Sequence, residues 1–315
     1  MKNMKKAIEV RNLVKRYKSA ETNAVDDISF DVEAGQLFAL LGPNGAGKTT
    51  TISILNTTLA PTGGVAKIAG YNVNTHSSEV RQHIGVIFQN PSLDMNLTAE
   101  ENVRFHAILY GLYGFRPLYR LIPKAYRKKV EELAHILGIE NDIFKPIKTF
   151  SGGMKRKLDI LRSLLHQPHV LILDEPTVGL DPASRRNLWQ YIQQVRHESG
   201  TSVLLTTHYL DEAENSDTIC IMNQGRIVSY GTTSKIKSDL VEEYLLIDAD
   251  DRDALRRELM TKAIAFTENG QVRINTKPNE IHQLLRSIET PLISVETHLP
   301  TLEDAYLAIT SEVAA

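Results

Sequence analysis

The segment GPNGAGKTT at residues 42–50 constrains the fold of this chain more than any other feature. It follows the apolar run LFALLG and matches the pattern G-x-x-x-x-G-K-[ST] of a phosphate-binding loop, which requires a strand before it and a helix after it. Glycines let backbone amides wrap around phosphates, the lysine reaches the β and γ oxygens, and the first hydroxyl binds Mg²⁺. A chance glycine-rich turn is the alternative, and the strand-loop-helix context argues against it. The residues expected to hold the phosphates are Gly42, Asn44, Gly45, Ala46, Gly47, Lys48, Thr49 and Thr50.

Short apolar runs alternate with helical stretches around this loop. The runs LFALLG, HIGVIFQN, HVLILDEP and SVLLTTH are bounded by turn residues, as is typical of parallel strands buried on both faces. Strand-like segments fill residues 7–36, and ICIMNQGRIVSYG predicts a hairpin that turns at Asn223–Gly225. The pattern predicts an α/β fold with a parallel-sheet core and an antiparallel β subdomain. Residues at about 92–166 are expected to form a helical subdomain.

A second strand-and-helix pattern begins near the end of the chain. It predicts a small C-terminal α/β accessory domain at 238–315, after a first domain at 1–237, with the boundary near residues 232–240. Residues 239–315 hold 15 acidic and 7 basic residues, a net charge of −8, whereas residues 1–238 carry +6. A mildly basic body suits a nucleotide-binding protein beside an anionic membrane, although an ordinary solvated surface explains the charge equally well.

Two carboxylates stand at the end of the run HVLILDEP. The run places Asp174 at the carboxyl edge of the sheet, where such sheets bind ligands, so we expect this residue to hold Mg²⁺. Glu175 points differently and can polarise a water molecule for attack on the γ-phosphate. By itself such a pair is a common capping arrangement, and the phosphate loop makes the catalytic interpretation the stronger one.

A second anion-binding segment, TFSGGMKRKLDILRSLL, begins at Thr149. Ser151 occupies an N-cap position, Gly152 and Gly153 leave the backbone amides uncovered, and basic residues follow. Such a helix N-terminus binds phosphate through its amides and its dipole. The chain therefore carries one anion site more than a single nucleotide needs.

Composition excludes several classes of protein. The 315 residues include no apolar run long enough to cross a bilayer, and the N-terminus lacks the apolar stretch of a signal peptide. The one cysteine, Cys220, cannot form an internal disulfide and is expected to be an ordinary core residue of a cytoplasmic protein.

Residues 1 to about 237 resemble the nucleotide-binding domain of ATP-binding-cassette (ABC) proteins. GPNGAGKTT and LILDE resemble the Walker A and B motifs, and FSGGMK resembles the signature LSGGQ, with departures at Phe150 and Met154 that we expect to be tolerated. Four further residues match family positions: Tyr17 matches the aromatic that stacks on adenine, Gln89 the Q-loop, Asp181 the D-loop and His208 the switch histidine.

The resemblance implies ATP hydrolysis with Mg²⁺. It assigns catalytic roles to Lys48, Gln89, Glu175 and His208, and metal contacts to Thr49, Gln89 and Asp174. In this family two cassettes face head to tail, so Ser151, Gly152 and Gly153 contact the ATP of the partner subunit, and Asp181 couples the two sites. Taken singly, these positions have ordinary explanations: Tyr17 as a half-buried aromatic, Gln89 as a strand-end polar residue, Asp181 as an N-cap and His208 as a structural histidine.

The subtype resembled is the daunorubicin-resistance type of bacterial exporter ATPase, on residues 70–112 and the final LEDAYLAITSE. It implies a separate six-helix ABC-2 type permease, a second cassette that is expected to be a copy of this chain, no nucleic acid, and a peripheral position on the inner membrane face. A soluble cassette ATPase that acts on nucleic acid or the ribosome is the alternative. It is opposed by the absence of a long inserted coiled coil and of a second cassette. A nucleotide sensor without turnover is opposed by Glu175 and His208.

Residues 110–127 are longer than the family pattern leads us to expect. They include YGFRPLYRLIPKAY, which is aromatic and basic and is broken by Pro117 and Pro123. The segment is expected to contact the permease or lipid headgroups. A solvated loop with a small core of its own is an equally good explanation.

Overall fold

The computed structural model describes residues 6–88, 93–207, 209–240, 244–276, 278–298 and 301–312. Two compact units, Met1–Gly231 and Thr232–Ala315, make up the chain. The division falls a few residues before the boundary expected after Lys237, because the helix that spans this boundary packs within the second unit.

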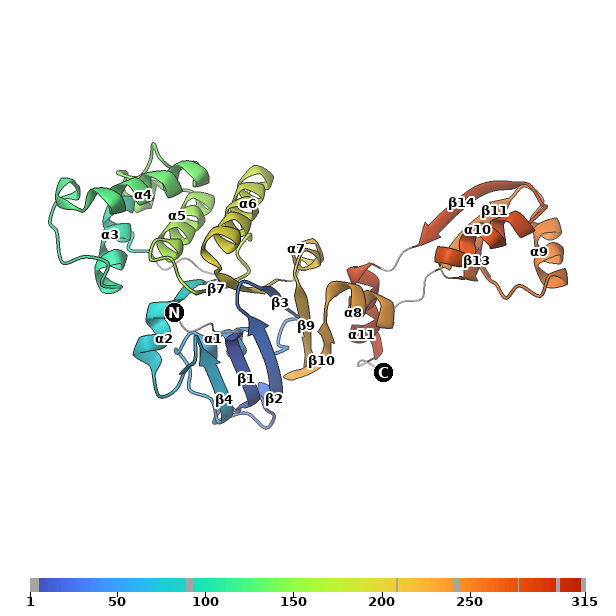
Figure 1. Ribbon diagram of the computed structural model, residues 1–315, viewed down its shortest axis with the longest axis horizontal. Helices are drawn as coiled ribbons and strands as arrows, with labels where there is room; N and C mark the ends of the chain where they lie inside the picture. Colours follow the sequence, from blue (N-terminus) through green and yellow to red (C-terminus); the bar gives the residue numbers. More distant parts are fainter. Residues whose placement is uncertain are drawn as a thin grey trace. The chain divides into compact units, whose positions relative to one another are not determined.

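The first unit contains two sheets (Figure 1). Its strands are β1 (Lys6–Lys15), β2 (Val25–Glu33), β3 (Leu37–Leu41), β4 (Gly63–Ile68), β5 (Tyr71–Asn72), β6 (Ile84–Ile87), β7 (Val170–Asp174), β8 (Ser202–Thr206), β9 (Thr218–Asn223) and β10 (Arg226–Gly231). The six-stranded sheet has the order β10-β9-β3-β8-β7-β6, in which β9 to β6 run parallel and β10 pairs antiparallel with β9. The four-stranded sheet β2-β1-β4-β5 is antiparallel. The predicted parallel core and antiparallel β subdomain are both confirmed.

Helices fill the connections between these strands. They are α1 (Lys48–Leu55), α2 (Ser77–His83), α3 (Ala99–Leu109), α4 (Lys124–Leu137), α5 (Gly152–Leu164), α6 (Pro182–Ser199) and α7 (Leu210–Glu214), with 3₁₀ turns η1 (Tyr119–Leu121) and η2 (Ile147–Thr149). Helices α3, α4 and α5 gather at one end of the unit (Figure 1), so the region expected to be helical is helical.

The cores follow directly from the apolar runs. All five residues of β3, β7 and β8 are buried, as strands covered on both faces require. One core lies between the parallel sheet and helices α3 to α6, and the other between the two sheets. Cys220 is fully buried in the second core, as expected, and burial raises the pKa of its thiol.

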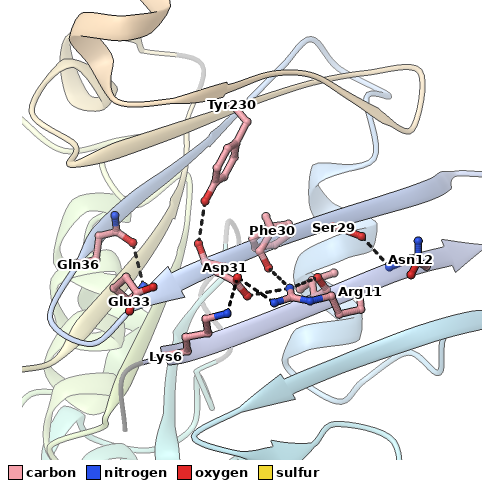
Figure 2. A network of polar contacts seen from close by, with 10 residues as sticks. Lys6, Arg11, Asn12, Ser29, Phe30, Asp31, Glu33, Gln36 and Tyr230 are labelled. Carbon is pink, nitrogen blue, oxygen red and sulfur yellow. Dashed lines mark hydrogen bonds and ion pairs between the residues drawn. The ribbon is translucent and has the colours of Figure 1, made fainter.

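A polar network links the two sheets of the first unit (Figure 2). The carboxylate of Asp31 on β2 accepts hydrogen bonds from Lys6 and Arg11 on β1, each at 2.8 Å. Partial burial of Asp31 opposes its ionisation, but these two cations outweigh burial and hold its pKa below the usual value. Tyr230 on β10 donates its hydroxyl to the main-chain oxygen of Asp31 at 3.3 Å. The network therefore joins an edge strand of the larger sheet to the smaller one.

The second unit contains a four-stranded antiparallel sheet of order β12-β13-β11-β14. Its elements are α8 (Thr233–Leu240), β11 (Tyr244–Ala249), α9 (Arg252–Thr261), β12 (Thr267–Asn269), β13 (Gln271–Asn275), α10 (Pro278–Ser287), β14 (Leu292–His298) and α11 (Leu302–Glu312). Apolar residues of α9 and α10 pack with β11 and β13 in one small core, and α8 contacts α11. This is the small α/β domain predicted from the sequence.

Candidate functional site

The loop between β3 and α1 is shaped by its glycines. Gly47 has φ +102°, and a Cβ added there would lie 2.4 Å from the main-chain oxygen of Ala24. Gly42 has φ +152°, and a Cβ there would lie 2.3 Å from the main-chain oxygen of Met222. Other side chains would therefore need both a strained backbone and a displaced neighbour. The loop fits only as a glycine-rich turn, with its amides at the N-terminus of α1.

A cavity of about 190 Å³ lies over this loop. It is lined by Ala24, Asn44, Gly45, Ala46, Gly47, Lys48, Thr49, Thr50, Asp174 and Glu175. The structure thus brings most of the predicted phosphate-loop residues together with both strand-end carboxylates. Parallel pairing of β3, β8 and β7 sets this arrangement, because it aligns the carboxyl ends of these strands at one edge of the sheet.

The lysine of the loop is buried within it. Lys48 Nζ donates to the main-chain oxygens of Gly42 at 2.6 Å and Pro43 at 3.0 Å. Burial lowers the pKa of Lys48, and the nearby carboxylates of Glu175 and Asp174 oppose that shift. The ammonium is therefore held close to the backbone beside the cavity, in reach of an anionic ligand.

Asp174 and Glu175 lie in different environments. Asp174 is 7% exposed, and its Oδ1 accepts a hydrogen bond from Thr206 Oγ1 on β8 at 2.5 Å. Burial raises the pKa of Asp174, while Thr206 and Lys48 act in the opposite direction. Glu175 has φ +49°, a left-handed conformation that non-glycine residues seldom adopt. This turn directs the chain sharply away from the strand immediately after Asp174.

Arg156 holds this turn, and sequence reasoning missed it. The residue is 2% exposed on α5, and its guanidinium donates to four main-chain oxygens from two strand ends. The acceptors are Phe88, Asp174 at 3.2 Å, Glu175 at 2.8 Å and Pro176 at 2.9 Å. Burial lowers its pKa, with carboxylates of Asp159, Asp174 and Glu175 opposing the shift. Arg156 therefore connects α5, the helix of the FSGGMK motif, to Phe88 directly after β6 and to the main chain of Asp174 and Glu175.

Glu212 is a second residue that the sequence analysis did not predict to belong to the site. It is 6% exposed on α7, and its two carboxylate oxygens accept hydrogen bonds from the hydroxyls of Thr177 and of Thr207, the latter at 2.7 Å. Thr207 Oγ1 in turn accepts from the Tyr209 amide at 2.9 Å. The carboxylate thus joins the segment after Glu175 to the residues on either side of position 208. Its only sequence signal was an acidic residue in the first turn of a short helix.

Ser151 stands at the N-cap of α5, as predicted, and its hydroxyl accepts a hydrogen bond from the Met154 amide at 3.2 Å. Both Ser151 and Gly152 are exposed. Asp181 caps α6 through the Ser184 amide at 2.9 Å, and hydrogen bonds from Ser184 lower its pKa to about 2. Among the described residues that line the 190 Å³ cavity, neither Ser151 nor Asp181 occurs. The second anion-binding segment is therefore separate from the first within one chain.

Three further residues were predicted to belong to the site: Tyr17, Gln89 and His208. Tyr17 is 43% exposed, and its hydroxyl lies 3.4 Å from Thr50 Oγ1, at the edge of the phosphate loop. Gln89 and His208 lie outside the described residues. A larger hollow of about 640 Å³ lies between α6 and α7 and is lined by side chains such as Arg185, Trp189 and Tyr209. None of its described lining residues belongs to the phosphate-binding loop, so it is a different site.

Comparison with known proteins agrees with this geometry. Residues 25–178 match the family model described as ABC transporter. The chain is 36% identical over 325 aligned positions to the daunorubicin/doxorubicin resistance ATP-binding protein DrrA of Streptomyces peucetius, covering 98% of this chain and 94% of that protein. It is 35% identical to the Nod factor export ATP-binding protein I of Ralstonia nicotianae, covering 96% and 93%.

Solved structures resemble the first unit in the same way. An ATP-binding subunit of an ABC transporter superposes with a TM-score of 0.67 at 32% identity, over 74% of this chain and 92% of that one. A dimeric ATP-binding cassette in a post-hydrolysis state with ADP and Pi gives a TM-score of 0.64 at 25% identity, over 71% and 98%. The fold and the site define an ABC-type P-loop ATPase. The chain belongs to the ATP-binding subunits of ABC transporters, and it binds and hydrolyses ATP.

Proposed function

We propose that this chain energises an ABC-2 type exporter, working as a dimer that closes around two ATP molecules beneath a separate permease. The observation that carries the proposal is the pairing of a complete phosphate-loop cavity with an exposed Ser151 helix terminus that lies outside it. A head-to-tail dimer gives that terminus a γ-phosphate to hold, since it would lie over the cavity of the partner subunit.

Residues in and around the cavity divide the tasks of ATP binding and hydrolysis in this proposal. The loop amides and Lys48 hold the phosphates, and Tyr17 is proposed to stack on the adenine. Thr49 and Asp174 supply the hydroxyl and carboxylate oxygens that Mg²⁺ prefers, and both line the same cavity. The ion, when bound, neutralises charge that develops on the phosphates. Glu175 orients and deprotonates the attacking water, and Gln89 and His208 are proposed to complete the γ-phosphate contacts.

The export assignment draws on the relatives. The matched relatives that span nearly the whole chain are named for drug resistance and for Nod factor export, so we infer an exported cargo of drug, lipid or polysaccharide type. No helix in the described part of the chain is long and apolar enough to cross a membrane. As the resemblance to exporter subunits implies, the permease is proposed to be another chain, which would hold this subunit peripherally on the cytoplasmic membrane face.

A hollow of about 300 Å³ offers a place for a permease segment. It is lined by residues of α3, the preceding loop and α5, and it is rimmed by the exposed side chains of Phe105 and Leu109. An apolar rim that is exposed in the free chain is expected at a protein interface. Leu109→Asp should weaken co-purification with the permease while the ATPase rate of the free chain stays the same.

The Glu175→Gln variant tests the proposed catalytic role. The substitution preserves size and removes the base, so the variant should bind ATP, accumulate as a dimer and hydrolyse ATP at least about a hundredfold more slowly. Size-exclusion chromatography with ATP and a phosphate-release assay measure both effects. An ATPase rate equal to that of the wild type would remove Glu175 from the reaction. A Glu198→Gln variant, altered at an exposed position of α6, is the matched control.

A further inference from the structure

The segment between Glu101 and Glu131 has an unusual charge pattern. Its 29 residues include seven Arg and Lys residues and no Asp or Glu. Several large apolar side chains in the same segment are exposed: Phe115 by 65%, Leu118 by 47% and Leu121 by 51%. Exposed apolar and cationic side chains thus alternate along the connection between α3 and α4.

The connection is a built structure and not a loose loop. Arg104 on α3 donates to the main-chain oxygens of Arg116 at 3.1 Å and Pro117 at 2.6 Å, and it pairs with Glu100 at 3.1 Å. This one guanidinium therefore fastens the middle of the connection to the helix before it.

Aromatic residues form the inner side of the connection. Tyr113 packs edge-on against Tyr126 of α4, with ring centroids 4.8 Å apart, and the Tyr126 hydroxyl donates to the Val103 main-chain oxygen at 3.2 Å. Tyr119 packs edge-on against Phe144 at 5.2 Å. Tyr113 and Tyr126 pack against the core, whereas Phe144 is itself 59% exposed, and Phe115, Leu118 and Leu121 stay exposed beside these contacts.

The outer side combines two kinds of exposed residue. Leu118 and Leu121 are three residues apart around the 3₁₀ turn η1, so their side chains share one side of it. Arg116 and Arg120 beside them on the chain are exposed, and so is Lys128 on α4. We refer to Phe115, Arg116, Leu118, Arg120, Leu121 and Lys128 as the 115–128 surface.

We propose that the 115–128 surface binds the anionic headgroups of a membrane directly. Cationic side chains contribute attraction to a negatively charged leaflet, and aromatic or apolar side chains among them insert at the headgroup boundary. The lack of any acidic residue across the whole segment matches a uniformly anionic partner better than the mixed charges of a protein surface. The surface thus supplies a second attachment, independent of the permease. It rests on the proposed function only in that the subunit works beside a membrane.

Vesicle co-sedimentation of the full-length chain tests the proposal without a permease. Phosphatidylcholine vesicles are compared with vesicles that also contain phosphatidylglycerol. The chain should bind the anionic vesicles preferentially at an ionic strength of about 0.1 M and lose that preference at about 1 M, where the Debye length is only about 3 Å. A triple variant, R116Q/R120Q/K128Q, should weaken binding by roughly a hundredfold, since each charge contributes about a fivefold factor.

Two comparisons make the result specific. The matched variant K67Q/R186Q/R257Q removes the same charge from exposed positions elsewhere and should leave vesicle binding nearly unchanged. F115S/L118S/L121S should also weaken binding, because it removes the apolar insertion while every cation stays. The ATPase rate of each variant, which should match the wild type, reports on folding.

The opposite outcomes overturn the proposal. Equal binding of the wild type to neutral and anionic vesicles, or equal losses in the two charge variants, would show that the 115–128 surface is no headgroup site. Loss of permease co-purification in R116Q/R120Q/K128Q without vesicle binding by the wild type would assign the surface to a protein contact instead. In each of these cases an intact ATPase rate leaves the proposed ATPase function standing.

Discussion

The guanidinium of Arg156 donates a 2.8 Å hydrogen bond to the main-chain oxygen of Glu175. Glu175 holds a left-handed backbone conformation at φ +49°, and its amide donates to the Thr206 main-chain oxygen at 3.0 Å on the other side. The strained turn that aims the proposed general base is therefore held from two directions. Since Ser151 is the N-cap of α5 and Arg156 lies on that helix, the arginine also connects a chain's own carboxylates to the terminus that we propose contacts the partner's ATP.

Arg156→Gln should therefore impair turnover more than nucleotide binding. Glutamine cannot reach four carbonyl oxygens, so Glu175 should lose its fixed position and kcat should fall at least about tenfold. The phosphate loop is untouched, and ATP affinity should stay close to the wild-type value. Unpaired buried carbonyls should also lower the free energy of unfolding by about 2–4 kcal/mol. Steady-state ATPase kinetics, ATP titration and thermal unfolding measure these three effects.

The control for Arg156 is Arg186→Gln, the same chemical change at an exposed position of α6. It should leave kcat and unfolding unchanged. A lowered melting temperature of Arg156→Gln with an unchanged kcat would mean that the arginine serves stability alone.

Glu212 should act as a positioning residue through its two threonine partners. Glu212→Ala removes the acceptor for the Thr177 and Thr207 hydroxyls and should lower kcat about tenfold or more, because the segments around Glu175 and position 208 are no longer joined. ATP affinity should change little. Glu212→Gln keeps one carbonyl oxygen and an amide that can donate, so it should recover part of the rate.

A higher kcat for Glu212→Gln than for Glu212→Ala would show that Glu212 positions the site and does not only stabilise the fold. Glu214→Ala, two residues further on α7 at an exposed position, is the control and should retain the wild-type kcat. Equal rates for Glu212→Ala and the wild type would contradict the positioning role.

Buried imidazoles should make the helical region sensitive to acid. Burial lowers the pKa of His106 to about 3, with the Arg162 cation and His166 adding to the effect. In the unfolded chain this histidine has a pKa of 6.5, so below that pH the unfolded chain binds a proton that the folded chain does not bind. The free energy of unfolding therefore falls as the pH falls from 6.5 toward 3. One such group accounts for about 1 kcal/mol between about pH 7 and 5.5.

Replacing His106 by phenylalanine tests that assignment. His106 Nε2 is buried without a hydrogen-bond partner among the described residues, so a ring without nitrogens should be tolerated. The loss of unfolding free energy between about pH 7 and 5.5 should shrink by about 1 kcal/mol in His106→Phe. It should persist in His135→Gln, where an exposed histidine is altered. Identical pH profiles for His106→Phe and the wild type would show that this imidazole does not cause the acid sensitivity.

The parallel core could be predicted from sequence because each of its strands is a short, continuous apolar run. LFALL, VLILD and SVLLT form β3, β7 and β8, whose ends lie within two residues of the ends of the predicted runs. Strand β4 is not predicted by the same reasoning, since GGVAKI opens with two glycines and only two of its residues are buried. Pairing with β1 stabilises it instead, which is a long-range effect that no local pattern records.

The candidate site also contains residues that the sequence predicts and residues that it does not. The phosphate loop, Asp174 and Glu175 follow from motifs, because backbone geometry leaves little choice of residue there. Arg156 and Glu212 do not, because each acts on groups that become neighbours only after folding. A basic residue in an anion-binding helix terminus suggests a phosphate contact, yet the Arg156 side chain turns inward to main-chain oxygens.

Ser151→Arg tests whether the second anion-binding segment serves the partner subunit. A bulky cation at this N-cap blocks the approach of a neighbouring nucleotide, so ATPase activity should fall at least about a hundredfold while monomeric ATP binding stays nearly intact. Ser78→Arg in the first turn of α2 is the matched control. Mixing inactive Ser151→Arg with inactive Lys48→Ala is the decisive experiment, because a mixed head-to-tail dimer holds one complete site. Random pairing should restore about a quarter of the wild-type rate. If both residues serve the same chain's nucleotide, the mixture stays inactive and Ser151→Arg loses ATP binding as well.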